Sequence, residues 1–124
     1  MSVKKTAQGA KYKDLITKTD SDVQAEQVDV NVQMAQNSLQ QGILSTKSLV
    51  LSAQGKVKEA EVKLAQAKRN QESAKSSVPL NVQKLIDTFQ ATKQAELDVE
   101  TATEAFKSTQ EVLVHLQSVE TELF

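Results

Sequence analysis

The sequence predicts an all-α protein, a long antiparallel helical hairpin of the coiled-coil type that associates into an oligomeric bundle. Three observations predict it. The composition, with 15 Gln and 13 Ala against 3 Gly and 1 Pro, favours long helices. Apolar residues recur at steps of three and four residues along most of the chain, which is the period of a helix with one apolar face. The single proline, Pro79, separates two such runs, and a short connection makes two helices antiparallel neighbours.

The size and composition of the chain limit its core. Its 124 residues include 3 Phe and 1 Tyr as the only aromatic rings, and the 39% of apolar residues are mostly Ala, Val and Leu. Such a chain forms one small unit with a narrow core, because it lacks the large rings that fill a wide one. With no Cys, disulfides and thiolate zinc sites are excluded.

The first helix is expected over residues 21–76. An N-cap and an acidic first turn at residues 20–22 predict its start, and Pro79 predicts its end, since the residue before a proline avoids the α region. From Val50 onward the apolar steps form a regular heptad pattern. Two successive steps of four within residues 35–43 resemble a stutter, where a coiled coil locally straightens. The apolar stripe consists of Val28, Val32, Ala35, Leu39, Ile43, Val50, Ala53, Val57, Ala60, Leu64, Ala67 and Ala74.

The second helix is expected over residues 81–122, after a turn at residues 77–80. Either Pro79 takes the first helical position or Asn81 caps the helix. At about 1.5 Å per residue the two helices are roughly 84 and 63 Å long. Helices of that length cannot be buried in a compact globule of this size, so they are expected to lie side by side. The resulting hairpin covers residues 20–124. The second apolar stripe consists of Val82, Leu85, Ile86, Phe89, Val99, Ala102, Phe106, Leu113, Leu116 and Leu123.

Folding the chain at the turn predicts which residues face each other. For a turn centred between residues 78 and 79, the numbers of facing residues sum to about 157. The two richest apolar runs, residues 43–51 and 106–116, then meet. Each run is apolar over more than one helix face, so the surplus predicts contacts with helices of other subunits. The candidate protein-interface residues in these runs are Ile43, Leu44, Leu49, Val50, Leu51, Phe106, Val112, Leu113, Val114 and Leu116.

The same pairing leaves the start of the first helix without a facing segment. Phe124 lies opposite about residue 33 in this register. The valines before that point therefore have no facing partner in the hairpin, and contact with another molecule or with a folded-back segment of the chain is expected. These further candidate interface residues are Val23, Val28, Val30 and Val32.

Two alternatives concern the first helix. Gly42 resembles a helix C-cap followed by an apolar contact, which would break the chain into three helices over 21–41, 45–76 and 80–122. We favour the continuous helix, because a glycine inside a helix costs only about 1 kcal/mol. Residues 28–32 alternate with a period of two, so a short strand is the second alternative.

The charge is distributed in blocks, although the whole chain carries a net charge of only −1. Residues 1–19 form a basic N-terminal arm of +4, followed by −4 over residues 20–46, +4 over 47–75 and −5 over 76–124. Blocks of alternating sign can guide self-pairing, even though each surface ion pair contributes only tenths of a kcal/mol. We expect the arm to dock on an acidic neighbouring copy.

Candidate chemistry is sparse. His115 is the single histidine and lies four residues after Glu111, which places both on one helix face, but a structural metal site needs about four ligands. A row of three glutamates lacks the Glu-x-x-His motif of di-iron bundles and is expected to be solvated. We therefore predict no metal and no cofactor. The row consists of Glu96, Glu100 and Glu104.

The sequence also argues against catalysis and nucleic-acid binding. It contains no phosphate-binding glycine loop, nucleophile elbow or zinc-protease motif, so no enzymatic activity is predicted. Lysines surround Tyr12 and line the first helix, but the isoelectric point of about 5.8 and the single arginine do not suit a surface that follows phosphates.

The alternation of Ala, Gln and Leu in the segment VKEAEVKLAQAKR at residues 57–69 resembles the helical hairpins of efflux adaptors and secretion-filament subunits. This alternation is common to antiparallel coiled coils. Two classes of function follow. The first, which we favour, is a non-enzymatic building block of a virion, tail or secreted filament that binds copies of itself and other assembly proteins. The second is a soluble adaptor or chaperone that binds a different protein. We expect a soluble cytoplasmic protein, because there is no signal peptide and no apolar run long enough for membrane insertion.

Overall fold

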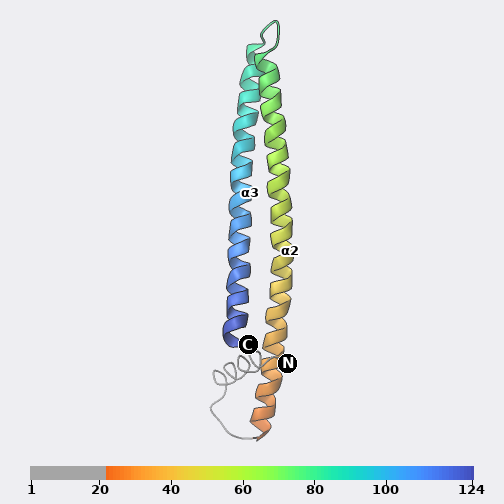
Figure 1. Ribbon diagram of the computed structural model, residues 1–124, viewed down its shortest axis with the longest axis vertical. Coiled ribbons are helices and arrows are strands. Elements are labelled where there is room, and N and C mark those ends of the chain that lie inside the picture. The colour runs from red at the N-terminus through yellow and green to blue at the C-terminus, as the bar shows by residue number, and fades with distance from the viewer. Residues whose placement is uncertain (1–21) are drawn as a thin grey trace. The chain divides into compact units, whose positions relative to one another are not determined.

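The computed structural model describes residues 22–124, with side chains from residue 27 onward. It contains two helices, α2 (Asp22–Lys75) and α3 (Val82–Leu123), joined by a short turn (Figure 1). The predicted helical hairpin is confirmed, and each helix boundary lies within one residue of the prediction. The basic arm at residues 1–19 and the side chain of Val23 lie outside the described residues.

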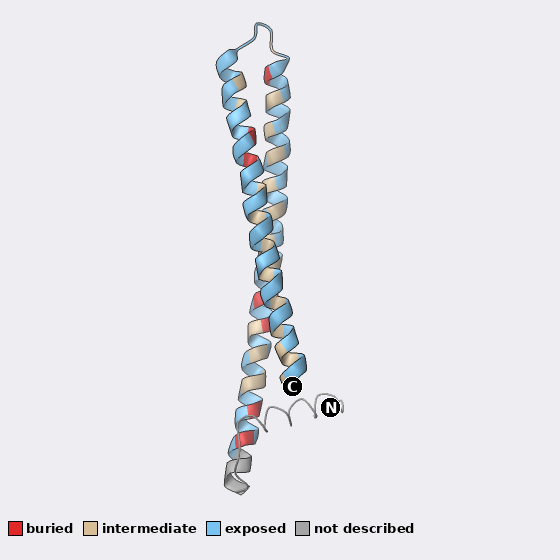
Figure 2. Cartoon of the chain, turned by 90° about the vertical axis from the view of Figure 1, so that its left-hand side faces the viewer, coloured by how far each residue is buried: buried red, intermediate tan, exposed pale blue. Residues whose placement is uncertain are grey.

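The chain divides into two compact units. The turn unit holds Leu49–Gln110, and the terminal unit holds the residues up to Ser48 together with Glu111–Phe124. In each unit a stretch of α2 packs against a stretch of α3, and in the turn unit the buried and half-buried residues lie on the sides where the two helices face each other (Figure 2). We call this contact line the seam.

Side chains close both helix ends at the turn. The backbone N–H and the hydroxyl of Ser76 both donate to the carbonyl oxygen of Glu72, at 3.2 and 3.1 Å, and so satisfy a carbonyl that the end of α2 leaves free. At the start of α3, the side-chain oxygen of Asn81 accepts the backbone N–H of Lys84 at 3.1 Å. Asn81 is therefore the N-cap, which was one of the two predicted alternatives. The Val78–Pro79 peptide bond between these ends is cis.

The seam of the turn unit follows a strict heptad pattern on both helices. Its half-buried and buried positions alternate steps of three and four, as the sequence predicts for α2 from Val50 onward. On α3 the pattern differs from the prediction, because Val82, Ile86 and Phe89 are exposed and threonines occupy part of the seam. The seam positions are Val50, Ala53, Val57, Ala60, Leu64, Ala67, Gln71 and Ala74 on α2, and Leu85, Thr88, Thr92, Ala95, Val99, Ala102, Phe106 and Thr109 on α3.

The terminal unit has its own small core around the C-terminal residue. Phe124 is 3% exposed and packs with Val28 and Val32 of α2, and further apolar side chains lie against this cluster. The expectation that these two valines have no facing partner in the hairpin is therefore wrong. The aromatic residue at the chain end thus belongs to the same buried cluster as two of the valines that the pairing rule left over. The supporting side chains are Ala35, Leu39 and Leu123.

The helix α2 is continuous through Gly42, as favoured above. Residues 28–32 are also helical, so neither the three-helix chain nor the short strand is formed. Gly42 does not have the positive φ that a left-handed C-cap requires, so α2 runs through it without a break. Nearby, the hydroxyl of the buried Thr46 donates to the carbonyl oxygen of Gly42 at 2.8 Å. The two predicted steps of four are present in the burial pattern at Ala35, Leu39 and Ile43.

Candidate interaction surface

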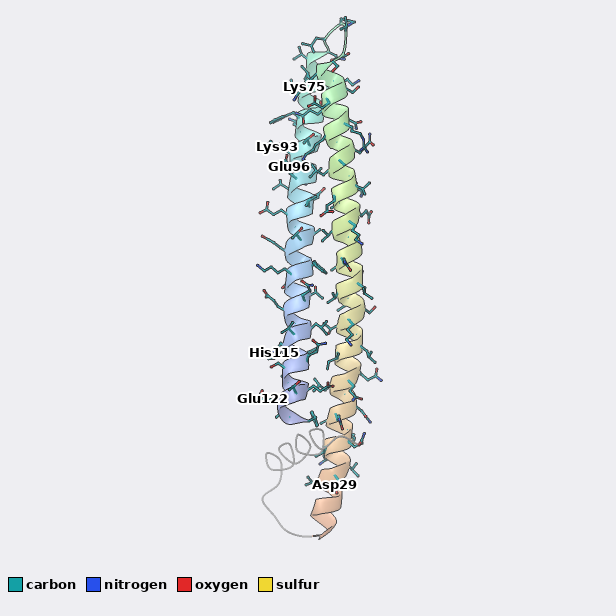
Figure 3. All side chains as sticks on the ribbon, in the orientation of Figure 1. Asp29, Lys75, Lys93, Glu96, His115 and Glu122 are labelled. Atoms are coloured by element: carbon teal, nitrogen blue, oxygen red, sulfur yellow. The ribbon has the colours of Figure 1, made fainter. Side chains whose placement is uncertain are left out.

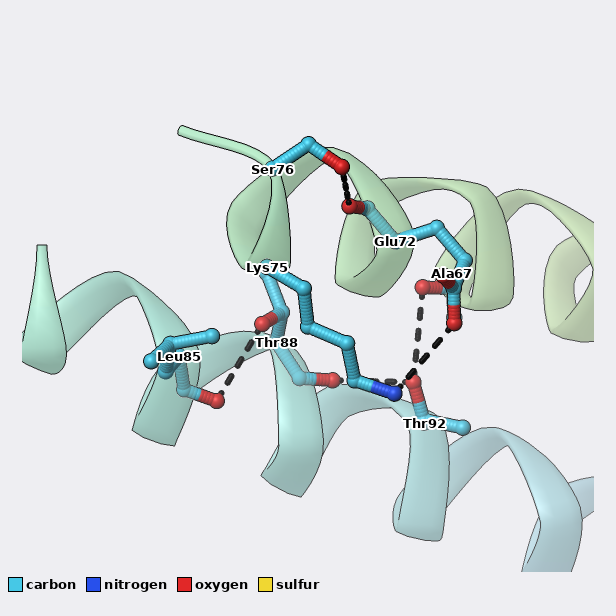
Figure 4. A network of polar contacts seen from close by, with 7 residues as sticks. All are labelled: Ala67, Glu72, Lys75, Ser76, Leu85, Thr88 and Thr92. Atoms are coloured by element: carbon cyan, nitrogen blue, oxygen red, sulfur yellow. Dashed lines mark hydrogen bonds and ion pairs between the residues drawn. The ribbon is translucent and has the colours of Figure 1, made fainter. Parts of the chain in front are cut away.

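A hydrogen bond between the two helices defines their register in the turn unit. Thr92 is 5% exposed, and its hydroxyl lies 2.9 Å from the carbonyl oxygen of Thr88 and 3.3 Å from that of Ala67 on the other helix (Figure 4). The residue numbers 67 and 92 sum to 159, close to the value of about 157 expected for a hairpin with this turn. A side chain as short as threonine reaches a backbone carbonyl of the neighbouring helix only where the two helices approach closely.

Small residues explain this close approach. Along the α2 side of the seam, alanine recurs at every seventh residue, and the register places a larger residue of α3 opposite each one. Small side chains facing large ones let the helices interdigitate at short distance. The result is a seam so narrow that only Ala74, Thr92 and Ala95 are buried in the turn unit. The pairs are Ala53 with Phe106, Ala60 with Val99, Ala67 with Thr92, and Ala74 with Leu85.

A groove of about 210 Å³ shows which residues share one side of this seam. Lys56 directly precedes a seam residue of α2, Ala105 directly precedes one of α3, and both line the groove. Residues that directly follow Ala60, Ala67 and Ala74 therefore lie on the opposite side, because the two flanking positions of a heptad lie on either side of its seam. The complete lining is Leu49, Ser52, Ala53, Lys56, Ala102, Ala105 and Thr109.

The side of the seam opposite the groove is a continuous exposed surface, which we call the outer face. On α2 it contains three residues spaced by seven, each directly after a seam alanine. On α3 it contains two rows of three residues spaced by seven, one row beside the seam and the next row further from the seam. All nine are exposed. The outer face consists of Glu61, Lys68 and Lys75 on α2, and of Val82, Ile86, Phe89, Lys93, Glu96 and Glu100 on α3.

The outer face has two chemically different halves. Among these nine residues, the half nearer the turn combines apolar side chains with lysines, and the other half is acidic. The equivalent neighbours on α2, Glu72 in the first half and Lys58 in the second, leave the first half net basic and the second net acidic. The boundary lies at Lys93, whose ammonium is 5.4 Å from the ring centroid of Phe89 and 3.6 Å from a carboxylate oxygen of Glu96 (Figure 3). These contacts hold the amine between the aromatic ring and the first carboxylate of the acidic half.

The turn adds two more exposed apolar residues. Val78 is 95% exposed and Leu80 is 57% exposed. With Val82, Ile86 and Phe89 they place five large apolar side chains on the surface within twelve consecutive residues. Val82, Ile86 and Phe89 lie together on the outer face, and exposed apolar patches commonly mark interaction sites.

The structure separates the predicted interface residues into two groups. In the turn unit, Leu49 and Leu51 are exposed, whereas Val50 and Phe106 take part in the seam. In the terminal unit, the seam and the core use Val28, Val32, Ile43, Leu113 and Leu116, while the exposed residues are Val30, Leu44, Val112 and Val114. The sequence reasoning did not select Val78 or Leu80 as interface residues, and it assigned Val82, Ile86 and Phe89 to the wrong face.

The polar residues considered for chemistry lie on the surface. His115 and Glu111 are exposed on α3, and so are Glu96, Glu100 and Glu104. Among the side chains of residues 27–124, no three His, Asp or Glu come close enough to hold a metal ion together. Every buried side-chain nitrogen or oxygen in that range has a hydrogen-bond partner.

Neither α2 nor α3 has a stretch both long and apolar enough to cross a membrane. Comparisons with protein-family models, with curated proteins and with solved structures found no match to this chain. The interaction surface is therefore interpreted from its own geometry and chemistry.

Proposed function

We propose that this chain is a non-enzymatic structural protein, a self-associating helical hairpin that serves as a building block of a larger assembly of the virion, tail or secreted-filament type. The observation that carries the proposal is the ratio of exposed to buried apolar side chains. Among the described residues, fourteen large apolar side chains are exposed, whereas six apolar residues are buried, two of them alanines. A two-helix seam leaves this surplus without cover, and further copies of the hairpin can cover it.

The surplus is large enough to offset much of the cost of association. Complete burial of a Val, Leu, Ile or Phe side chain contributes about 1.5–3 kcal/mol, so burying the exposed half of one contributes about 1 kcal/mol. Contacts that cover most of the fourteen side chains contribute on the order of 10 kcal/mol, comparable to the cost of about 4–15 kcal/mol for bringing two molecules together.

A soluble coiled-coil adaptor or chaperone that binds a different protein is the second candidate. The exposed turn favours it, because Val78 and Leu80 project apolar side chains where α2 and α3 meet. A hairpin that presents such a turn can insert it into an apolar groove of another protein.

Co-expression of two copies that carry different affinity tags tests the proposal. If the chain associates with itself, capture on one tag recovers the other copy in comparable amount, and an unrelated helical protein with the second tag is not recovered. If only the captured copy is recovered, together with a protein of a different sequence, the adaptor function replaces the structural one.

A further inference from the structure

We infer that the outer face of the turn unit is a docking site for the same face of a second copy, bound antiparallel about a two-fold axis near Lys93. This inference rests on the proposed self-association and specifies its geometry. A two-fold interface brings one surface patch against itself, so the patch must be self-complementary. The outer face meets this requirement only in one direction.

Charge determines that direction. In the half nearer the turn the charged residues of the outer face are basic, namely Lys68, Lys75 and Lys93, and in the other half they are acidic. Parallel pairing would place like charges against each other, which costs free energy. Antiparallel pairing places the lysines of each copy along the acidic half of the other. The acidic residues are Glu61, Glu96 and Glu100.

One apolar pair fits the same arrangement, although the axis also places Ile86 of each copy opposite Glu100 of the other. Phe89 precedes Lys93 by four residues and the exposed Leu97 follows it by four, so a two-fold axis near Lys93 brings Phe89 of each copy beside Leu97 of the other. The axis thus creates two identical aromatic–aliphatic contacts on either side of the two Lys93 side chains, each of which pairs with Glu96 of its own copy. Phe89 and Leu97 are 51% and 56% exposed, and both gain cover by this pairing.

Ion pairs within one copy do not prevent the pairing. Lys93 pairs with Glu96, and Lys75 pairs with Glu72 at 3.3 Å, but all four side chains are 45–73% exposed. Exposed pairs of this kind contribute about 0–1 kcal/mol and exchange partners readily. Lysine side chains can therefore turn from a neighbour on their own helix to a carboxylate of the second copy.

Charge reversal on each half tests the inference. The double variant Lys68→Glu/Lys75→Glu makes the charged side chains of both halves predominantly acidic, and Glu96→Lys/Glu100→Lys makes them predominantly basic. Light scattering is expected to show at least about tenfold weaker self-association for each variant alone. An equimolar mixture of the two variants is expected to regain association as a mixed species, because opposite faces then meet.

The matched control carries the same charge change on the groove side. The double variant Lys56→Glu/Lys63→Glu has the same net charge as Lys68→Glu/Lys75→Glu, but both of its residues directly precede seam positions. It is expected to self-associate like the wild type and to gain nothing from mixing with Glu96→Lys/Glu100→Lys. Equal behaviour of the two acidic variants would show that net charge, rather than this face, controls association.

Loss of an apolar contact gives an independent reading. Phe89→Ala is expected to weaken association at least about tenfold, whereas Val62→Ala, at a similarly exposed position outside the outer face, leaves it unchanged. If the wild type self-associates and none of these outer-face variants alters it, the docking site is overturned while the proposed function stands. A wild type that remains monomeric at tens of micromolar overturns both.

Discussion

The substitution Gly42→Ala distinguishes a continuous α2 from a chain broken at the glycine. A Cβ built at Gly42 meets nothing within 4 Å, and the glycine does not have a positive φ. In a continuous helix, alanine removes the conformational entropy penalty of glycine and stabilises the fold by about 1 kcal/mol. At a left-handed C-cap, the same substitution would destabilise it by about 1–2 kcal/mol. The two arrangements thus predict opposite signs.

Thermal unfolding followed by circular dichroism at 222 nm measures the difference. For a chain of this size, a gain of about 1 kcal/mol raises Tm by roughly 4 °C. Gly55→Ala is the matched control, because Gly55 is helical in both arrangements and its Cβ also meets nothing within 4 Å. We expect both variants to raise Tm by a similar amount. A lower Tm for Gly42→Ala beside a higher one for Gly55→Ala would refute the continuous helix.

Three further predictions concern the seam, the terminal core and the arm. Ala67→Leu is expected to lower the free energy of unfolding by about 1–3 kcal/mol in chemical denaturation, because the larger side chain forces apart helices that approach closely beside Thr92. Ala65→Leu, at an exposed position, is its control, and an equal effect of both substitutions would contradict the narrow seam. Phe124→Ala removes a buried ring and should lower the free energy of unfolding by up to about 3 kcal/mol, with faster hydrogen exchange of amides in the terminal unit. Unchanged exchange in that unit would contradict the small core. Removal of residues 1–19 should leave helicity and Tm nearly unchanged but weaken assembly. The remaining assembly should depend less on salt, since the charge of +4 on the arm acts over about 10 Å at 0.1 M ionic strength. Loss of helicity would show that the arm belongs to the core.

The sequence predicts the architecture well because helix period and turn signals are local. The heptad of α2 contains alanine, valine and leucine at nearly every seam position, so its apolar pattern identifies the seam directly. Pro79 likewise identifies the turn through its restricted backbone, and Asn81 identifies the start of α3 through its side-chain oxygen.

The α3 seam is harder to predict, because polarity and burial disagree there. Thr88 and Thr92 occupy the seam, where small β-branched side chains fit and their hydroxyls bond to helix carbonyls. The larger Val82, Ile86 and Phe89 lie on the surface, so a search for apolar residues follows the wrong face. The signal that identifies the seam is the alanine at every seventh residue of α2, since the residues opposite it must follow the same period on α3.

The two valines at the start of α2 show a different limit. Counting residues back from the turn leaves Val28 and Val32 beyond the end of α3, but both belong to one buried cluster with Phe124. A pairing rule based on residue number treats every side chain as equally long. At the end of a helix, one large ring extends the contact further than the rule allows.

Self-association is the central claim, and sedimentation equilibrium of the purified chain tests it most directly. One chain has a mass of 13.6 kDa, so association appears as a weight-average mass at a higher multiple of that value. We predict a mass of at least two chains at tens of micromolar that falls toward one chain on dilution and rises with concentration. A mass of 13.6 kDa that stays constant up to 100 μM would contradict the account.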